Sequence, residues 1–458
     1  MDLFSTIAAI STPPGSGGIS IIRISGPDAM KIGDSVFEAS SRKKISECPS
    51  HTIHHGHIVS HEGKRLDEVL VSLMKAPKTF TGEDTVEINC HGGLLVTKAI
   101  LAEVLRAGAV SAGKGEFTKR AFLNGKLDLC EAESVIDIIN SKTSLEQEIS
   151  VNNLGGALSD KINTLRERII TLSANIQVLI DYPDEGLEPF GDDEFAEELG
   201  NIHSELHRLI ATSDSGMLIR SGIPTAIAGK PNVGKSSLMN LLSGQQKAIV
   251  TDIEGTTRDV IEEYVNIGNI TLRLSDTAGI RDTEDVVEKI GVQRSLECIE
   301  SSELVIFVAD AASGLDQSDF DIINATEGKK KLALINKCDK GSLISKADLS
   351  PYFDYVIDFS VKTEQGLAEL ENVITNLFEL GEVMTNASSV ITNARHRDAL
   401  IKADDAIKSA IDTQNAGIPI DTTFIDLEAA ASALGEIVGL TVGEEIVDKI
   451  FHKFCIGK

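Results

Sequence analysis

Residues 229–236 are Gly229-Lys230-Pro231-Asn232-Val233-Gly234-Lys235-Ser236, and this stretch predicts the fold of the middle of the chain. Two glycines separated by four residues, then Lys and Ser, have the spacing of a phosphate-binding loop. A strand-like apolar run at 224–228 precedes the loop, and a helical run at 237–242 follows it. A strand, a Gly-rich turn and a helix N-terminus together direct backbone N–H groups at phosphate oxygens. We therefore expect this loop to bind a nucleotide, with Lys235 as a positive charge and Ser236 as a Mg²⁺ ligand.

The segments around this loop alternate between short apolar runs and helical patterns. The apolar runs lie at 224–228, 271–274, 304–308, 332–335 and 355–357. Alternation of this kind predicts a mostly parallel sheet covered by helices on both faces.

Two further motifs follow apolar runs of this segment, Asp276-Thr277-Ala278-Gly279 and Asn336-Lys337-Cys338-Asp339. Asp276 can hold a Mg²⁺-bound water, and the Gly279 N–H can sense the γ-phosphate. Asp339 can accept both the ring N–H and the exocyclic amine of guanine. Adenine would leave that carboxylate unsatisfied, at a cost of about 1–3 kcal/mol. The sequence therefore predicts a GTP site.

The residue after the first of these motifs is Ile280, where Ras-like enzymes carry the Gln that orients the attacking water. An aliphatic side chain cannot hydrogen-bond water, so another group must take this role. The next segment offers four acidic side chains, Asp282, Glu284, Asp285 and Glu288. Their pattern also fits a solvated acidic loop, and residue type alone does not choose among them.

Composition sets the general class. A chain of 458 residues is long enough for about three domains. Its 42% hydrophobic and 25% charged residues are those of a globular protein. No apolar stretch has the roughly 20 residues of a membrane span, and the N-terminus has no signal-peptide pattern, so we expect a cytoplasmic protein without a membrane contact. The net charge of −27 argues against broad capture of nucleic acid, so any RNA contact should be local.

Differences in residue pattern divide the chain into four segments. Residues 1–118 mix strand-like runs (20–24, 68–73 and 85–88) with helical patterns near 27–38 and 94–107, which predicts an α+β domain. Residues 119–215 and 383–458 have helical spacing, and they flank the nucleotide-binding segment, 216–382. We therefore expect a helical domain in two parts with an α/β domain inserted between them.

Further motifs lie along the whole chain. They are the loop Thr251-Asp252-Ile253-Glu254-Gly255-Thr256-Thr257, Thr12-Pro13-Pro14-Gly15, Ile22-Arg23-Ile24-Ser25-Gly26, Phe80-Thr81-Gly82-Glu83-Asp84, Arg120-Ala121-Phe122-Leu123-Asn124-Gly125-Lys126 and the terminal Cys455-Ile456-Gly457-Lys458. With these, the chain resembles the MnmE (TrmE) family of tRNA-modification GTPases from end to end. The resemblance implies an N-terminal α+β domain similar to tetrahydrofolate-binding enzymes, a helical domain, and an inserted Ras-like P-loop GTPase domain.

The resemblance also implies roles for individual residues of the nucleotide site. The GTP-binding set falls on Asn232, Val233, Gly234, Lys235, Ser236, Ser237, Thr251, Asp252, Ile253, Glu254, Gly255, Thr256, Asp276, Thr277, Ala278, Gly279, Asn336, Lys337, Asp339, Ser360, Val361 and Lys362. The Mg²⁺ ligands fall on Ser236 and Thr257, and the K⁺ ligands on Asn232, Thr251, Ile253 and Thr256. Lys235 and the water-orienting Glu288 are the implied catalytic residues.

A second site is implied for 5-formyltetrahydrofolate or a related folate. Its contacts fall on Arg23, Glu87, Lys126 and Lys458. Cationic groups suit the glutamate carboxylates of folate, and a carboxylate suits the pterin N–H edge. Cys455 is a candidate functional thiol beside the folate.

The function that the resemblance implies is GTP hydrolysis in tRNA modification. A homodimer would work with a flavin- and NADH-dependent partner enzyme, as a heterotetramer or larger assembly. The pair would add a carboxymethylaminomethyl-type group to C5 of the wobble uridine of certain tRNAs, using a folate one-carbon unit. Two alternatives remain open, a ribosome-assembly GTPase and a nucleotide-dependent scaffold.

Overall fold

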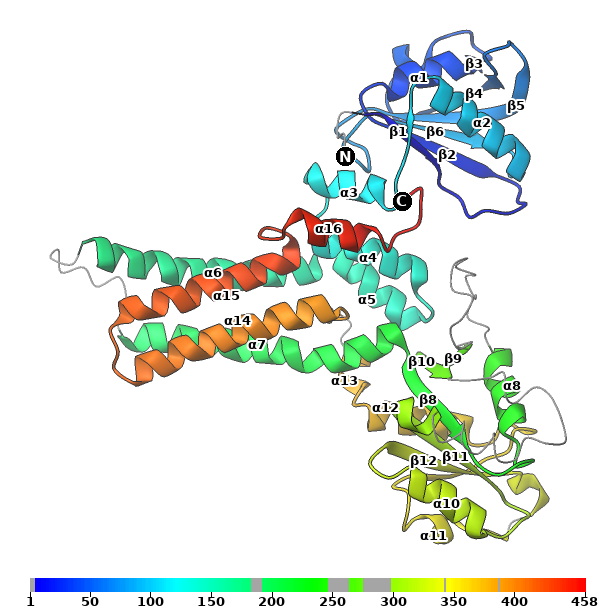
Figure 1. Cartoon of the computed structure of the whole chain (residues 1–458), viewed down its shortest axis with the longest axis vertical. Helices are drawn as coiled ribbons and strands as arrows, with labels where there is room; N and C mark the ends of the chain where they lie inside the picture. The colour runs from blue at the N-terminus through cyan, green and yellow to red at the C-terminus, as the bar shows by residue number, and fades with distance from the viewer. Residues whose placement is uncertain (1–4, 183–191, 246–262, 275–297, 342, 386–387) are drawn as a thin grey trace. The chain divides into compact units, whose positions relative to one another are not determined.

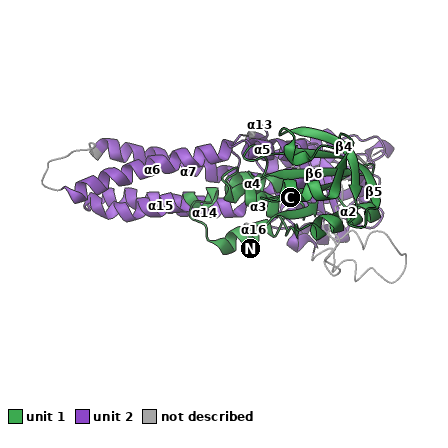
Figure 2. Cartoon of the chain, turned by 90° about the horizontal axis from the view of Figure 1, so that it is seen from above, with its two compact units in different colours: residues 1–136, 435–458 green, residues 137–434 purple. Residues whose placement is uncertain are grey.

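The computed structural model describes residues 5–182, 192–245, 263–274, 298–341, 343–385 and 388–458 (Figure 1). These residues form two compact units, which Figure 2 colours separately. Unit 1 contains the residues up to 136 together with 435–458, and unit 2 contains 137–434. The finer division of the chain at 118, 215 and 382 stays a prediction.

Among the described residues of unit 1, seven strands form one sheet in the order β3-β4-β5-β6-β2-β1-β7. The strands are β1 (Ile7–Ile10), β2 (Ser20–Ser25), β3 (Phe37–Ala39), β4 (Thr52–Val59), β5 (Arg65–Met74), β6 (Thr85–Cys90) and β7 (Val110–Ser111). Neighbours are antiparallel, apart from the parallel pair β1 and β7. The helices within the segment that forms this sheet are α1 (Ala29–Val36), α2 (Leu94–Arg106) and the short 3₁₀ turn η1 (Ile45–Glu47). The α+β domain predicted for this part of the chain is confirmed.

Alternation along the strands of this sheet separates a core face from an open face. On β2, Ile22 and Ile24 are fully buried in the core that α1 and α2 cover, while Arg23 between them is half-buried. Because side chains in a strand point alternately to opposite faces, Arg23 lies on the other face, called here the open face, although Ile7 and Ala9 of β1 are buried there with Phe117. Glu87 of β6 is its direct cross-strand neighbour in the ladder. The strand pattern thus places two residues of the predicted folate set side by side.

The end of the chain belongs to unit 1. Helix α16 (Glu444–Phe451) contacts α3 (Glu116–Leu123), and its Phe451 packs in one apolar cluster with α4 (Leu129–Asn140). After α16 the chain pairs with the segment before α3, through a bridge between Lys114 and Ile456. The Phe117 N–H donates a hydrogen bond of 3.2 Å to the carbonyl of Lys458. These contacts fix the terminal Cys-Ile-Gly-Lys motif against the N-terminal domain.

Unit 2 contains long helices and a second sheet. The helices are α5 (Ser144–Leu154), α6 (Ala157–Asp181), α7 (Asp192–Ser221), α14 (Ala394–Asn415), the 3₁₀ turn η3 (Ile420–Thr422) and α15 (Thr423–Val438), the last of which ends in unit 1. Helix α6 buries Leu158, Ile162, Leu165, Ile169, Leu172 and Ile176. That spacing makes one apolar stripe, which explains why this segment forms a helix packed on others. The helical character predicted for both flanking segments is confirmed.

Of the strands described in unit 2, six form a sheet in the order β13-β12-β11-β8-β10-β9. They are β8 (Ile223–Ala228), β9 (Glu263–Ile267), β10 (Ile270–Leu274), β11 (Leu304–Asp310), β12 (Lys330–Asn336) and β13 (Val356–Asp358). The pairs are parallel except for β9 with β10. Each apolar run predicted as a strand coincides with one of these strands, so the mostly parallel sheet is confirmed.

Helices cover both faces of this sheet. They are α8 (Lys235–Gln245), α10 (Gln317–Ala325), α11 (Lys346–Leu349), α12 (Leu367–Leu377) and α13 (Gly381–Thr385), with the 3₁₀ turn η2 (Cys338–Lys340). Strand β11 directs Ile306 and Val308 into a core shared with α8 and α12. It directs Phe307 and Ala309 into a core shared with α10 and α11. A strand buried on both faces needs an unbroken apolar run, which is why these strands were visible in the sequence. Within the described residues, no helix combines the length and apolar character of a membrane span.

Candidate functional site

The phosphate-binding loop joins the end of β8 to the start of α8. Its glycines have left-handed backbone conformations, with φ of +146° at Gly229 and +106° at Gly234. A Cβ on Gly229 would lie 2.3 Å from the carbonyl oxygen of Val308, and one on Gly234 would lie 2.2 Å from Nδ2 of Asn336. Both glycines are therefore needed for backbone conformation and for close approach to neighbouring strand ends.

Lys235 is the first residue of α8, and its ammonium lies over the loop. Its Nζ donates hydrogen bonds of 2.6 Å to the carbonyls of Gly229 and Lys230. Burial lowers the pKa of the Lys235 ammonium, because a desolvated cation lacks the stabilisation that water gives. A partly buried cation at a helix N-terminus favours an anionic ligand such as phosphate. The next residues, Ser236 and Ser237, are exposed at the same helix end.

Asn336 connects the phosphate-binding loop to the segment predicted to bind the base. It ends β12, is 2% exposed, and donates from Nδ2 to the carbonyl of Val233 over 2.8 Å. Its Oδ1 accepts a hydrogen bond of 3.4 Å from the Val361 N–H. Three segments that are distant in sequence are thus joined by one buried amide.

Asp339 lies in η2, next to the segment 360–362. Its Oδ1 accepts a hydrogen bond of 2.8 Å from the hydroxyl of the buried Ser360. The Ser360 hydroxyl in turn accepts one of 3.4 Å from the Thr363 N–H. The Asp339 side chain is thereby oriented while remaining exposed, as a group that recognises a base must be. Lys362 is also exposed.

Lys337 reaches back to the phosphate-binding loop. Its Nζ donates a hydrogen bond of 2.9 Å to the carbonyl of Asn232 and one of 2.5 Å to Oδ2 of Asp310. The structure therefore brings together the predicted loop residues Asn232 to Ser237 and the predicted base-binding residues Asn336, Lys337, Asp339 and Ser360 to Lys362. Parallel strands make this possible, because β8, β11 and β12 end at the same edge of the sheet.

The predicted folate residues gather on the open face of the unit 1 sheet. Arg23 Nε lies 2.8 Å from Glu87 Oε1, and about a fifth of each side chain is exposed. The Arg23 guanidinium lies over the rings of Phe80 and Phe117, at 5.8 and 5.6 Å from their centroids. Cation–π contacts of this kind attract the guanidinium to the ring faces.

Lys458 and Lys126 complete this group. Burial lowers the pKa of the Lys458 ammonium, and Arg23 lowers it further, while Glu87 and Cys455 act in the opposite direction. Lys458 thus interacts electrostatically with all three of these neighbours. Lys126 packs against Gly82 and donates a 3.4 Å hydrogen bond to the carbonyl of Pro77, which places it beside the loop that carries Phe80.

Comparison with known proteins decides the family. The model of the MnmE helical domain matches residues 129–455, and that of the GTP-binding protein TrmE N-terminus matches residues 6–126. A tRNA modification GTPase MnmE of Acetivibrio thermocellus is 48% identical and covers 99% of each chain. One of Clostridioides difficile is 44% identical and covers 100% of each. The chain belongs to the MnmE family of tRNA-modification GTPases. The family and the enzyme class expected from the sequence are confirmed.

Among solved structures, the G domain of the FeoB iron transporter of T. maritima is 28% identical to the MnmE-family chain over 33% of its length and 96% of its own. The TM-score is 0.26, so the assignment of the fold comes from the strand order and connections described above.

Several predicted residues of the MnmE-family site lie outside the described residues. They are Thr251, Asp252, Ile253, Glu254, Gly255, Thr256, Thr257, Asp276, Thr277, Ala278, Gly279 and Glu288. Their roles therefore stay predictions, including the second Mg²⁺ ligand, the K⁺ loop and the water-orienting glutamate.

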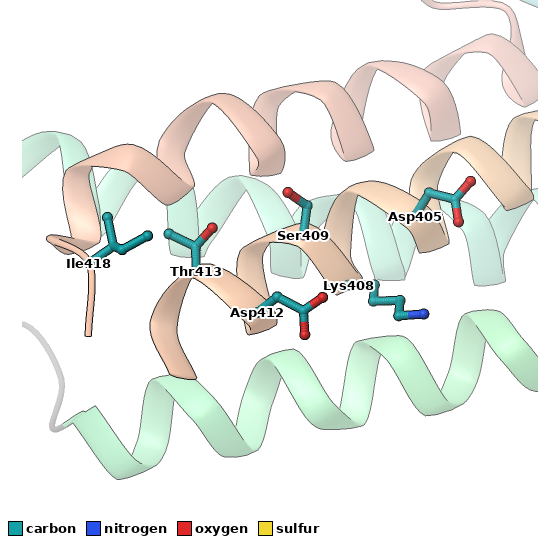
Figure 3. A pocket seen from close by; sticks show the side chains of 6 residues that line it. All are labelled: Asp405, Lys408, Ser409, Asp412, Thr413 and Ile418. Atoms are coloured by element: carbon teal, nitrogen blue, oxygen red, sulfur yellow. The ribbon is translucent and has the colours of Figure 1, made fainter. Parts of the chain in front are cut away.

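A shallow pocket lies away from these motifs. It has a volume of about 420 Å³ and lies along α14, lined by Asp405, Lys408, Ser409, Asp412, Thr413 and Ile418 (Figure 3). Two carboxylates and one ammonium line it, and none of its residues belongs to the motifs named above. Phosphate recognition depends on converging N–H groups rather than on a deep cavity, so this pocket does not displace the loop as the nucleotide site.

Three groups of site residues were not predicted from the sequence. Phe80 and Phe117 support Arg23, and Asp310 pairs with Lys337. Lys230 pairs with Asp316 at 2.8 Å and with the buried Asp319 at 2.7 Å, which ties the loop to α10. A signal existed for Asp310 alone, because it ends an apolar run beside the run that ends at Asn336.

Proposed function

We propose that the chain hydrolyses GTP with Mg²⁺ and K⁺, and that this cycle drives the modification of tRNA. The observation that carries the proposal is the joining of the phosphate-binding loop to the base-recognition segment by Asn336 and Lys337. Family membership supports the GTPase activity and the role in tRNA modification.

Within this proposal, the chain's own residues divide the work. Lys235 and the loop N–H groups hold the β- and γ-phosphates, and Asp339 with the 360–362 segment selects guanine. Ser236 and Thr257 would hold Mg²⁺, while Asn232, Thr251, Ile253 and Thr256 would hold K⁺. When bound, these cations neutralise charge that develops on the phosphates, in place of an arginine finger. Glu288 orients the attacking water, because Ile280 cannot.

Turnover measurements test this division. GTP hydrolysis by the full chain should require K⁺ and should rise per molecule with protein concentration, because two G domains are needed to complete the cation site. Lys235→Ala should lose turnover in both salts and report any contaminating activity. Equal rates in sodium and potassium would remove K⁺ from the mechanism, and a Lys235→Ala variant as fast as the wild type would reject the site.

The second part of the proposal is a folate site at Arg23, Glu87, Lys126 and Lys458, taking 5-formyltetrahydrofolate or a related folate. Its support is a partly buried group of charges in which Arg23 pairs with Glu87 and lies over two aromatic rings, with Lys458 near both. Charge-assisted hydrogen bonds suit the carboxylates and the pterin edge of a folate. Cys455 would lie beside the bound folate as a candidate thiol.

Calorimetric titration with 5-formyltetrahydrofolate tests the folate site. Glu87→Gln should weaken binding at least tenfold, because the amide cannot replace a charged acceptor. Glu68→Gln is the matched control, since Glu68 is an exposed carboxylate on the same sheet and pairs with His55. If the wild type binds the folate and Glu87→Gln binds it with the same affinity, the ligand site lies elsewhere.

The third part concerns partners. We propose a cytoplasmic homodimer that works with a flavin- and NADH-dependent enzyme, as a heterotetramer or larger assembly. The pair would add a carboxymethylaminomethyl-type group to C5 of the wobble uridine of certain tRNAs. The acidic net charge of −27 implies that the tRNA contacts are few and local.

An apolar pair on the open face of the unit 1 sheet supports the homodimer. Ile53 is 67% exposed and Leu70 is 47% exposed, and Leu70 lies directly across from His55 on the same face as Ile53. A second copy of the chain would cover this surface. Light scattering on a Leu70→Lys variant should show a shift towards monomer, whereas an unchanged dimer would move the interface away from this face.

A further inference from the structure

Asp310 ends β11 at the edge of the sheet where the nucleotide site lies. In the ladder it is the direct partner of Asn336, the residue that ends β12. Its carboxylate is fixed at both oxygens. Oδ1 accepts a hydrogen bond of 2.9 Å from the Ala312 N–H, and Oδ2 accepts one of 2.5 Å from Lys337 Nζ. The side chains of Asp310 and Lys337 are 17% and 30% exposed, so the pair is shielded more than a surface pair.

Lys337 is held in an unusual backbone conformation. Its φ is +65°, in the left-handed region that non-glycine residues seldom adopt. The residue whose carbonyl it contacts, Asn232, also has φ of +65°. Two strained residues, one in the base-recognition segment and one in the phosphate-binding loop, are thus connected through one ammonium group. Strained conformations persist where surrounding contacts fix them.

The charge of Lys337 explains how an acidic side chain fits at this position. A carboxylate close to a loop that binds phosphates opposes the binding of an anion unless a cation neutralises it. The Lys337 ammonium supplies that cation, and Asp310 gives it a fixed, charge-assisted partner. Without Asp310, Lys337 keeps only the Asn232 carbonyl as a partner among these contacts, and its long side chain becomes free to rotate towards solvent.

We propose that Asp310 is a positioning residue for nucleotide binding, which acts through Lys337 to keep Asn232 and the base-recognition segment in their binding conformations. This inference rests on the proposed nucleotide-binding function of the same site. It assigns Asp310 no contact with the nucleotide itself.

A double-mutant cycle on the full chain tests the inference. The dissociation constants of GDP and GTP are measured for wild type, Asp310→Asn, Lys337→Met and the double variant, in sodium and in potassium. Asp310→Asn keeps an acceptor for the Ala312 N–H but loses the charge, and it should weaken binding of both nucleotides about tenfold. In the Lys337→Met background, Asp310→Asn should weaken nucleotide binding less than twofold, because the ammonium group that Asp310 positions is absent.

Matched controls separate positioning from general stability. Glu369→Gln removes the carboxylate of another pair in the same domain, Lys346 with Glu369 at 3.5 Å, and should leave nucleotide affinity within twofold of wild type. Unaltered nucleotide affinity in Asp310→Asn, with or without a lower melting temperature, would overturn the inference. Additive losses in the double variant would also overturn it, because Asp310 would then act independently of Lys337.

The same titrations distinguish this inference from the proposed function. If the wild type binds GDP and ADP equally, guanine selection is rejected. A loss of nucleotide affinity in Asp310→Asn that is absent in the Lys337→Met background would still support the positioning role. A loss measured in sodium does not depend on the K⁺ site. Wild type that binds neither nucleotide would reject both.

Discussion

The side-chain amide of Asn336 occupies the space where a Cβ on Gly234 would lie, only 2.2 Å from that position. The same amide donates to the carbonyl of the preceding residue, Val233. The end of β12 thus contacts the phosphate-binding loop, and the loop approaches it so closely that only glycine fits at position 234.

Gly234→Ala should therefore distort the phosphate-binding loop and leave the rest of the domain folded. The new methyl group would displace Asn336, and the backbone φ of +106° would be strained for alanine. We expect GTP affinity to fall at least tenfold in a titration. Gly314→Ala is the control, because nothing lies within 4 Å of its Cβ position, and it should bind GTP as wild type does. Tight GTP binding by Gly234→Ala would mean that the loop binds in a different conformation.

Asp339→Asn should change the base that the site selects. The amide presents a donor where guanine needs an acceptor, so preference should move from GTP towards xanthosine triphosphate. The Ser360 hydroxyl can still hydrogen-bond residue 339, so the local fold should persist. Asp358→Asn, at an exposed carboxylate of the same edge, is the control. Unchanged GTP affinity in a competition titration would contradict the assignment of Asp339.

Glu288→Ala should bind GTP nearly normally and hydrolyse it slowly. Its removal leaves the phosphates held by Lys235 and Mg²⁺ but takes away the group that orients water. Asp282→Ala and Glu284→Ala are matched controls from the same acidic stretch and should stay close to wild type. Single-turnover hydrolysis in potassium ranks the three variants. A Glu288→Ala variant with the wild-type rate would assign the water-orienting role to another residue.

Stability should depend on pH through Glu146 of α5. Burial raises the pKa of this carboxyl from its ordinary 4.5 to about 7, although the Lys142 N–H bond opposes the shift. The folded protein then binds a proton that the unfolded chain releases. The contribution of Glu146 to the free energy of unfolding is fully present below pH 4.5 and is lost as pH rises through about 7.

Glu146→Gln should remove that dependence, because the amide is neutral at every pH and still accepts the Lys142 N–H, which lies 2.7 Å from Oε2 in the wild type. Melting temperatures at pH 5.5 and pH 8 are compared for wild type, Glu146→Gln and the exposed control Glu148→Gln. We expect Glu146→Gln to be more stable than wild type at pH 8. An identical change between the two pH values in all three proteins would show that Glu146 titrates normally.

The sequence predicted most of the G-domain sheet because its strands are buried on both faces. Runs such as 304–308 are therefore continuous and apolar, and glycine spacing marks the loop after β8. The contacts that the sequence did not reveal are long-range. The sequence places Asp310 at the end of an apolar run but does not indicate its contact with Lys337, and nothing near Arg23 indicates the ring of Phe117. Local periodicity carries no information on such pairs, since the folded topology brings them together.

Analysis of tRNA nucleosides tests the central claim most directly. A strain that lacks the gene is complemented with wild type, Lys235→Ala or Glu87→Gln, and the wobble uridine is measured by mass spectrometry. We predict that wild type restores the carboxymethylaminomethyl-type nucleoside, whereas Lys235→Ala and Glu87→Gln do not. Full modification in the uncomplemented strain, or full restoration by Lys235→Ala, would contradict a GTP-driven role in wobble-uridine modification.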